Sequence, residues 1–99
     1  MGGDWKDMFF GVQNNDFELV RYHICMGVDL NYQHPEFLTS PLIESIRFQY
    51  LEMTKYLLDN GAKPDLKEAE SNKTPLEIAK LLGYDNLYKL LQQYLKSNE

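Results

Sequence analysis

The sequence contains an internal repeat with a period of 34 residues, which is the separation between Gly27 and Gly61. Residues 17–31 (FELVRYHICMGVDLN) are matched along their length by residues 51–65 (LEMTKYLLDNGAKPD). A partial third copy follows at the same spacing in residues 87–90. A fixed period of this length is typical of repeat proteins, in which each unit is one supersecondary structure that stacks on its neighbours. The chain is therefore expected to fold as three stacked units.

Apolar residues at helical spacing predict two helices in each unit. Ser40-Pro41 and Thr74-Pro75 are typical helix starts, because the hydroxyl caps the first turn and proline needs no N–H there. Gly61 is expected to end the fourth helix in a left-handed conformation, as Gly27 ends the second. The other helix limits are expected near Asp4, Asn14, Asp16, Leu51, Leu82, Asp85 and Lys96.

The repeat register predicts which residues meet between helices. Gly11, Ser45 and Ala79 occupy equivalent positions and are all small, which predicts a close helix crossing between stacked pairs. In the third copy, Lys80 and Gln92 replace residues that are apolar in the earlier copies. Polar residues at stacking positions are typical of a terminal repeat that has no further neighbour.

Four segments resemble the ankyrin-repeat family. Residues 74–79 (TPLEIA) are similar to its T-P-L-H-x-A signature, and residues 40–45 (SPLIES) are a looser version. Residues 56–62 (YLLDNGA) and 27–31 (GVDLN) resemble the family's L-L-L-x-x-G-A and G-A-D-V-N segments. Tetratricopeptide repeats have a similar period, but they join all helices by short turns, whereas residues 28–39 and 63–73 form long polar connections here.

The resemblance implies an all-α ankyrin-repeat solenoid of three helix-turn-helix pairs, with long β-hairpin-like connecting fingers. It covers nearly the whole chain, so residues 1–99 are expected to form a single domain. The three repeats would span about residues 4–36, 37–70 and 71–96.

Composition and charge exclude several classes of function. The formal net charge of −5 disfavours a nucleic-acid binder and docking on an anionic membrane, since both require a basic surface. The single cysteine, Cys25, cannot form an intramolecular disulfide, which favours a reducing compartment. No secretory signal and no apolar run of membrane-spanning length is visible. The protein is therefore expected to be soluble and cytoplasmic.

No group of residues predicts catalysis or metal binding. His23, His34 and Cys25 do not have the spacing of a zinc site. Glu68 and Glu70 lie in a polar connection beside Lys67, which favours a solvated surface over a catalytic pair of carboxylates. Phosphate-binding, nucleophile-elbow and dinucleotide motifs are absent from the sequence. We expect no enzyme activity, no metal and no cofactor.

The ankyrin resemblance implies a protein-binding module that acts through its concave face, formed by the fingers and the first helix of each pair. The fingers would be residues 32–39 and 66–73, and Phe37 is expected to pack beneath its own loop. Aromatic residues are strong interface anchors. The candidate partner-binding residues are Tyr32, His34, Phe37, Glu44, Arg47, Phe48, Tyr50, Glu68 and Glu70.

The acidic charge favours a basic protein partner, and the chain is expected to be a monomer on its own. A narrower form of this hypothesis is an inhibitor or immunity protein that blocks a toxin or an enzyme. The alternative is a structural or designed scaffold without a natural ligand.

Overall fold

The computed structural model describes residues 2–97 of the chain, and Met1 and residues 98–99 of the expected domain lie outside the described residues. The described chain is all-helical, with six helices and no strand. The helices are α1 (Gly2–Gln13), α2 (Phe17–Cys25), α3 (Pro41–Arg47), α4 (Leu51–Asp59), α5 (Pro75–Leu82) and α6 (Asp85–Ser97).

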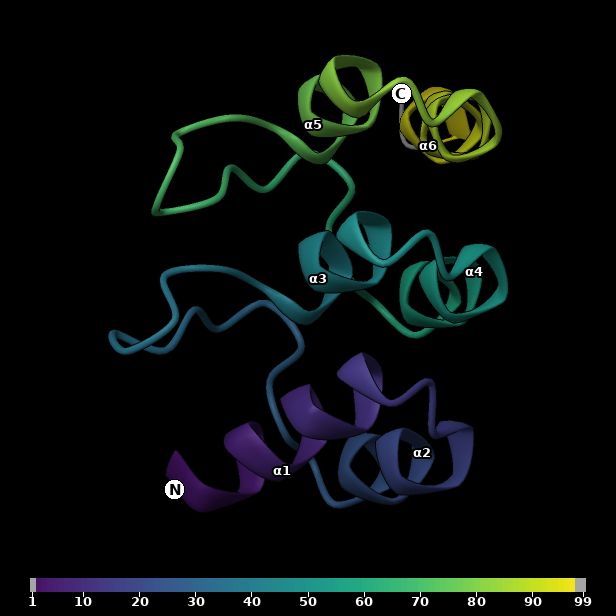
Figure 1. Cartoon of the computed structure of the whole chain (residues 1–99). Coiled ribbons are helices and arrows are strands. Elements are labelled where there is room, and N and C mark those ends of the chain that lie inside the picture. The colour runs from purple at the N-terminus through teal and green to yellow at the C-terminus, as the bar shows by residue number, and fades with distance from the viewer. Residues whose placement is uncertain (1, 98–99) are drawn as a thin grey trace.

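The helices form three stacked antiparallel pairs: α1 with α2, α3 with α4, and α5 with α6 (Figure 1). Helices α1, α3 and α5 stack in one row, and α4 and α6 pack against each other in the second row. The two long connections leave the row of α1, α3 and α5 on the same side (Figure 1). This arrangement places the connections and the first helix of each pair next to one another.

Side-chain caps explain where the helices begin. Asp16 accepts a hydrogen bond from Leu19 N at 3.1 Å, and Ser40 Oγ accepts one from Ile43 N at 3.3 Å. Thr74 and Glu77 form a reciprocal capping box, with bonds of 3.1 Å and 2.9 Å. Each bond satisfies a backbone donor that the first turn of a helix leaves without a partner. The predicted starts at Ser40-Pro41 and Thr74-Pro75 are confirmed, whereas α1 begins at Gly2, before the expected Asp4.

Helices α2 and α4 end shortly before the two glycines that were predicted to end them. The cap residues are Met26 and Asn60, and the next residues, Gly27 and Gly61, have φ angles of +90° and +104°. A residue with a Cβ atom is strained at such angles. These two glycines therefore turn the chain out of α2 and α4 into the connections.

The core lies between the stacked pairs. Its fully buried residues include Met8, Val12, Ile43, Ile46, Met53, Leu57 and Leu91. One polar contact is also buried there, since Ser45 Oγ and Thr54 Oγ1 lie 2.8 Å apart across the α3–α4 interface. Thr54 Oγ1 bonds further to Tyr50 O at 2.8 Å. Both hydroxyls are thus satisfied, as buried polar groups require.

The small residue Gly11 lies within a helix pair, not between pairs as the register predicted. A Cβ atom at Gly11 would come within 3.1 Å of Val20 Cγ2 and 3.3 Å of Leu19 Cδ2, and both residues belong to α2. Ser45 makes its hydroxyl contact to α4 of its own pair in the same way. The small residues therefore allow the two helices of one pair to approach closely.

The expected β-hairpin character of the connections is not confirmed. Their backbone hydrogen bonds mainly close local turns: Phe37 N and Leu38 N both donate to His34 O, at 2.9 Å and 2.8 Å. Asn72 N donates to Glu68 O at 2.8 Å in the second connection. A hairpin requires a repeated ladder between two strands, and these turn contacts do not form one.

Candidate functional site

A hollow of about 290 Å³ lies between the first helices and the two connections. We call it the central hollow. Helix α1 contributes Phe9 and Gln13, and helix α3 contributes Glu44 and Arg47. The connections supply the remaining lining residues, which are Phe37, Thr39, Glu68 and Glu70. Five candidate residues, Phe37, Glu44, Arg47, Glu68 and Glu70, therefore meet at one place on the face that the ankyrin resemblance implied.

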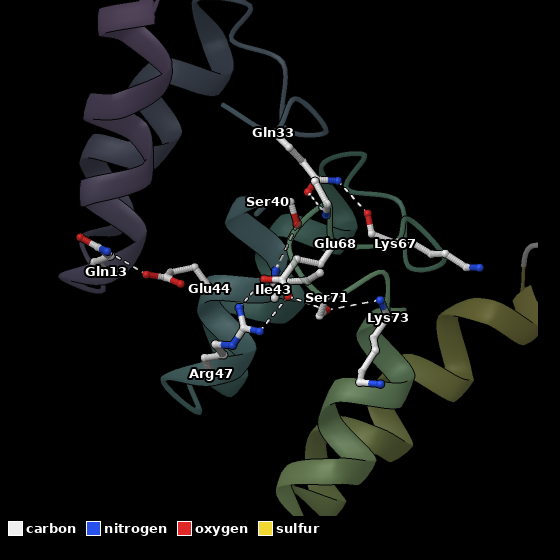
Figure 2. A network of polar contacts seen from close by, with 11 residues as sticks. Gln13, Gln33, Ser40, Ile43, Glu44, Arg47, Lys67, Glu68, Ser71 and Lys73 are labelled. Atoms are coloured by element: carbon white, nitrogen blue, oxygen red, sulfur yellow. Dashed lines mark hydrogen bonds and ion pairs between the residues drawn. The ribbon is translucent and has the colours of Figure 1, made fainter. Parts of the chain in front are cut away.

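Arg47 and Glu68, which both line this hollow, form an ion pair (Figure 2). The guanidinium donates two hydrogen bonds to the carboxylate, of which Nη2 to Oε1 is 2.8 Å long. Ser71 Oγ donates a third bond to Glu68 Oε1 at 2.7 Å. Only 1% of Glu68 is exposed, whereas the Arg47 side chain is 40% exposed. The expectation that Glu68 lies on a solvated surface is therefore wrong, because this partner from α3 covers it.

The surroundings of Glu68 shift its protonation. Burial alone would raise its pKa, but the bonds from Arg47, the neighbouring hydroxyls of Thr39 and Ser71 and the charge of Arg47 outweigh burial and lower the pKa to about 2. The Thr39 hydroxyl lies beside the carboxylate without the geometry of a hydrogen bond. Glu68 is thus ionised at neutral pH and neutralised by Arg47, so a partner would meet the guanidinium rather than this carboxylate.

Two contacts join the end of α1 to the second helix pair, one from α3 and one from the residue that precedes α4. Gln13 Nε2 donates to Glu44 Oε2 at 2.7 Å (Figure 2). The Tyr50 hydroxyl donates to Gln13 O at 2.9 Å. The amide of Gln13 leaves the second oxygen of Glu44 free to meet a ligand, because each carboxylate oxygen accepts separately. Glu44 is partly exposed and Glu70 is exposed, so both carboxylates can face a partner.

Phe48 and Tyr50 form an aromatic pair at the end of α3. Their ring centroids are 5.5 Å apart, and the planes are tilted by 33°. Phe48 is 47% exposed, while Tyr50 is half-buried and held through its hydroxyl. An exposed ring that rests on a fixed ring is a preformed apolar contact surface.

The remaining candidates, Tyr32 and His34, line a different pocket. This N-terminal pocket, of about 540 Å³, is bordered by the start of α1 and by the first connection. Its lining residues are Asp4, Trp5, Met26, Gly27, Val28, Asp29, Tyr32 and His34. Phe37, which lines the central hollow, is partly buried against α1, with its ring 5.0 Å from that of Phe9. The candidates therefore divide between the central hollow, the aromatic pair and the N-terminal pocket.

Two amide side chains join the connections, and the sequence reasoning did not identify them. Gln33 Nε2 donates to Lys67 O and Gln33 Oε1 accepts from Ala69 N, each at 2.7 Å (Figure 2). Asn31 Nδ2 donates to Gly61 O at 3.0 Å, and its oxygen accepts from Lys63 N at 2.8 Å. An amide can donate and accept at once, so each residue replaces a pair of backbone bonds. In the sequence, these two amides could have been noticed only by their spacing: Asn31 and Gln33 are two positions apart, as residues on one side of an extended chain are.

Within residues 2–97 no cluster of three or more His, Cys, Asp or Glu residues is arranged to hold a metal ion. Cys25 is exposed as a free thiol. None of the six helices in this range combines the length and the apolar character needed to cross a lipid bilayer.

Comparison with known proteins identifies the fold family. A family model described as ankyrin repeats (3 copies) matches residues 8–98. The chain belongs to the ankyrin-repeat family. Ankyrin repeats generally serve as protein-interaction modules, which agrees with a site that combines a hollow with an exposed aromatic ring.

Curated relatives contain similar segments in longer chains. A putative ankyrin repeat protein of Rickettsia felis is 32% identical over 90 residues, which cover 83% of this chain and 39% of the relative. A palmitoyltransferase of Lachancea kluyveri is 39% identical over 57 residues, covering 58% of this chain and 8% of that protein. A glycerophosphocholine phosphodiesterase of Eremothecium gossypii is 34% identical over 65 residues, covering 66% of this chain and 5% of that protein. The chain thus spans 39% or less of the length of each of these relatives.

Proposed function

We propose that this protein binds a basic partner protein through the face formed by the central hollow and the Phe48–Tyr50 pair. The observation that carries the proposal is the exposed ring of Phe48, which rests on Tyr50 instead of entering the core. Aromatic residues of this kind supply most of the energy at protein interfaces. Because Tyr50 is held by Gln13, the pair loses little freedom when a partner binds.

The charge around the hollow supports a basic partner. Glu44 and Glu70 border it, while the charge of Glu68 is balanced by Arg47. The surplus of negative charge agrees with the net charge of −5 for the whole chain. Complementary charges raise association rates and discriminate against partners of the wrong sign. Binding of a basic partner should therefore weaken as salt concentration rises.

A narrower form of the proposal is an inhibitor or immunity protein that covers the active site of a basic enzyme or toxin. It would act as a monomer in the cytoplasm, and the free thiol of Cys25 is compatible with a reducing compartment. The check is to assay a toxin encoded beside the gene with and without this protein. A neighbouring toxin that stays fully active would contradict the inhibitor role.

The experiment that tests the main proposal begins with affinity capture and mass spectrometry to identify the partner. Isothermal titration then compares Phe48→Ala and Tyr50→Ala with the parent chain. We expect each change to weaken binding by roughly 1–3 kcal/mol, the usual cost of truncating an interface anchor. Lys89→Ala, an exposed change on α6, is the matched control and should leave the affinity unchanged.

Thermal melts must accompany these titrations, because Tyr50, which precedes α4, also bonds to the end of α1. Tyr50→Phe removes only the hydroxyl bond and separates this structural role from the aromatic contact. If Phe48→Ala and Tyr50→Ala both remain folded and bind the partner as tightly as the parent, this face is not the binding site.

A further inference from the structure

The N-terminal pocket is a second site, separate from the central hollow. It lies beside the start of α1 and shares no lining residue with the central hollow. Its chemistry comes from two carboxylates, Asp4 and Asp29, and from three aromatic rings, Trp5, Tyr32 and His34. Binding of a ligand at the N-terminal pocket is therefore separate from the proposed binding of a partner at the central hollow.

The aromatic rings form two walls at right angles. Trp5 and His34 stack with their centroids 5.6 Å apart and their planes at 27°. Tyr32 stands perpendicular to both, at 86° to Trp5 and 88° to His34, with centroid distances of 6.1 Å and 6.3 Å. Tyr32 is 46% exposed and so presents part of its ring to solvent. The face of an aromatic ring attracts cations through its quadrupole.

The carboxylates of the N-terminal pocket add negative charge to it. Asp4 and Asp29 are both exposed, and neither pairs with a basic residue in the part of the chain that the structure describes. Lys6, the basic residue next to this region, is held by Glu36 at 2.9 Å. Asp29 Oδ1 accepts from Asn31 N at 2.8 Å, which leaves its other oxygen available. The pocket is therefore suited to a positively charged group.

The Trp5 indole is the second indication of a ligand. Trp5 is 3% exposed, and its Nε1–H has no hydrogen-bond partner although it is buried. Buried donors are nearly always paired, so an unpaired one needs an explanation. The neighbouring acceptor of His34 is already used, since Nδ1 accepts from Glu36 N at 3.1 Å. Trp5 also lines the N-terminal pocket, so a ligand seated there can supply the missing acceptor.

We propose that the N-terminal pocket binds a lysine or arginine residue of a partner peptide. The cationic head group lies between Asp4 and Asp29 and against the face of Tyr32, where charge and ring act together. The backbone carbonyl of the same residue accepts the hydrogen bond from Trp5 Nε1. An anionic ligand would be repelled by both carboxylates, and a purely apolar ligand would leave them unpaired.

Nuclear magnetic resonance of the 15N-labelled full chain tests this proposal. The chain contains one tryptophan, so the indole N–H gives a single resonance that reports on the pocket directly. The probe is N-acetyl-lysine methylamide, and the control probe is N-acetyl-norleucine methylamide, which has the same carbonyls and side-chain carbons without the ammonium group. The lysine probe should shift the indole resonance downfield with a saturable curve, and the norleucine probe should not do so at the same concentrations.

Two variants that each remove a carboxylate, and one control variant, test whether Asp4 and Asp29 bind the lysine probe. Asp4→Asn and Asp29→Asn should each weaken binding of the lysine probe about two- to fivefold, as expected for partly exposed charge pairs. Asparagine keeps the oxygen that accepts from Asn31 N, so Asp29→Asn preserves the local turn. Asp65→Asn, an exposed change in the second connection, should leave binding unchanged.

The proposal is overturned if the indole resonance does not respond to the lysine probe. It is also overturned if the norleucine probe produces an equal shift, or if Asp4→Asn and Asp29→Asn both bind like the parent. Phe48→Ala should leave the lysine probe unaffected, because that ring does not line the N-terminal pocket. These measurements therefore distinguish a failure of lysine binding at the N-terminal pocket from a failure of partner binding at the central hollow and the Phe48–Tyr50 pair.

Discussion

Replacing Arg47 by methionine tests the ion pair that lines the central hollow. The substitution keeps a long side chain on α3 but removes the guanidinium that donates two bonds to Glu68. The carboxylate is 1% exposed and would be left with the hydroxyl of Ser71 as its hydrogen-bond donor. An uncompensated buried charge is strongly destabilising, so we expect Arg47→Met to lower the free energy of unfolding at pH 7.

The size of the loss follows from the pKa of Glu68. The environment lowers this pKa from 4.5 to about 2 despite burial, chiefly through the Arg47 bonds. At about 1.36 kcal/mol per pH unit, the whole change corresponds to about 3.4 kcal/mol. The Arg47 side chain is 40% exposed and partly screened by water, so we expect a loss of about 2 kcal/mol.

The loss in the free energy of unfolding caused by Arg47→Met should become smaller as the pH falls. A carboxylate whose pKa is lowered by folding stabilises the protein above its unfolded pKa, and this contribution disappears as the pH falls through the folded value. The difference between parent and variant should therefore be largest well above pH 4.5 and should be lost as the pH falls through about 2.

Urea unfolding followed by circular dichroism at several pH values measures this difference, and Glu68→Gln completes a double-mutant cycle. If Arg47→Met and Glu68→Gln are strictly additive, or if the difference persists unchanged at pH 2, then the pair does not stabilise the fold in this way.

Other predictions concern the helix ends and the last repeat. Gly61→Val should cost about 1–2 kcal/mol in urea unfolding, because φ is +104° and no neighbour lies near the added Cβ; equal stability would contradict a backbone origin. Glu77→Gln should lower the melting temperature at pH 7 more than at pH 2, since the bond from Thr74 N lowers the pKa of Glu77; a loss that is the same at both values would refute a charge effect. The bond to Asp59, with burial, raises the pKa of Tyr94 to about 12. In an ultraviolet titration, Tyr94→Phe should remove the phenol transition that occurs at the highest pH. If that transition remains in the variant, it belongs to another tyrosine and the prediction is wrong.

Local signals were sufficient to predict most of the architecture. Ser40 and Thr74 begin α3 and α5 because their hydroxyls cap the first turn, and this effect depends only on residues within one turn. Gly61 marks the end of α4 for an equally local reason, its positive φ. The repeat period then places equivalent helices on top of one another, as the stacked pairs confirm.

The interior of the candidate site depends on contacts that no local pattern reports. Glu68 looks like a surface residue in a polar connection, yet it is buried by Arg47, which lies 21 positions away. Gln33 joins its partner backbone 34 and 36 positions away. Burial of a charge is decided by the partner that compensates it. A sequence without the stacking geometry does not reveal which partner that is.

The column of small residues shows how a correct pattern can be assigned to the wrong interface. Gly11 approaches Val20 and Leu19 of its own pair, so Gly11→Leu should destabilise by about 3 kcal/mol through overpacking. Val20→Ala opens space at the contact and should recover part of that loss, whereas Ile43→Ala, in the next repeat, should only add its own cost. Urea unfolding of the two double variants measures both coupling energies. If Gly11→Leu couples to Ile43→Ala as strongly as to Val20→Ala, the close approach lies between repeats after all.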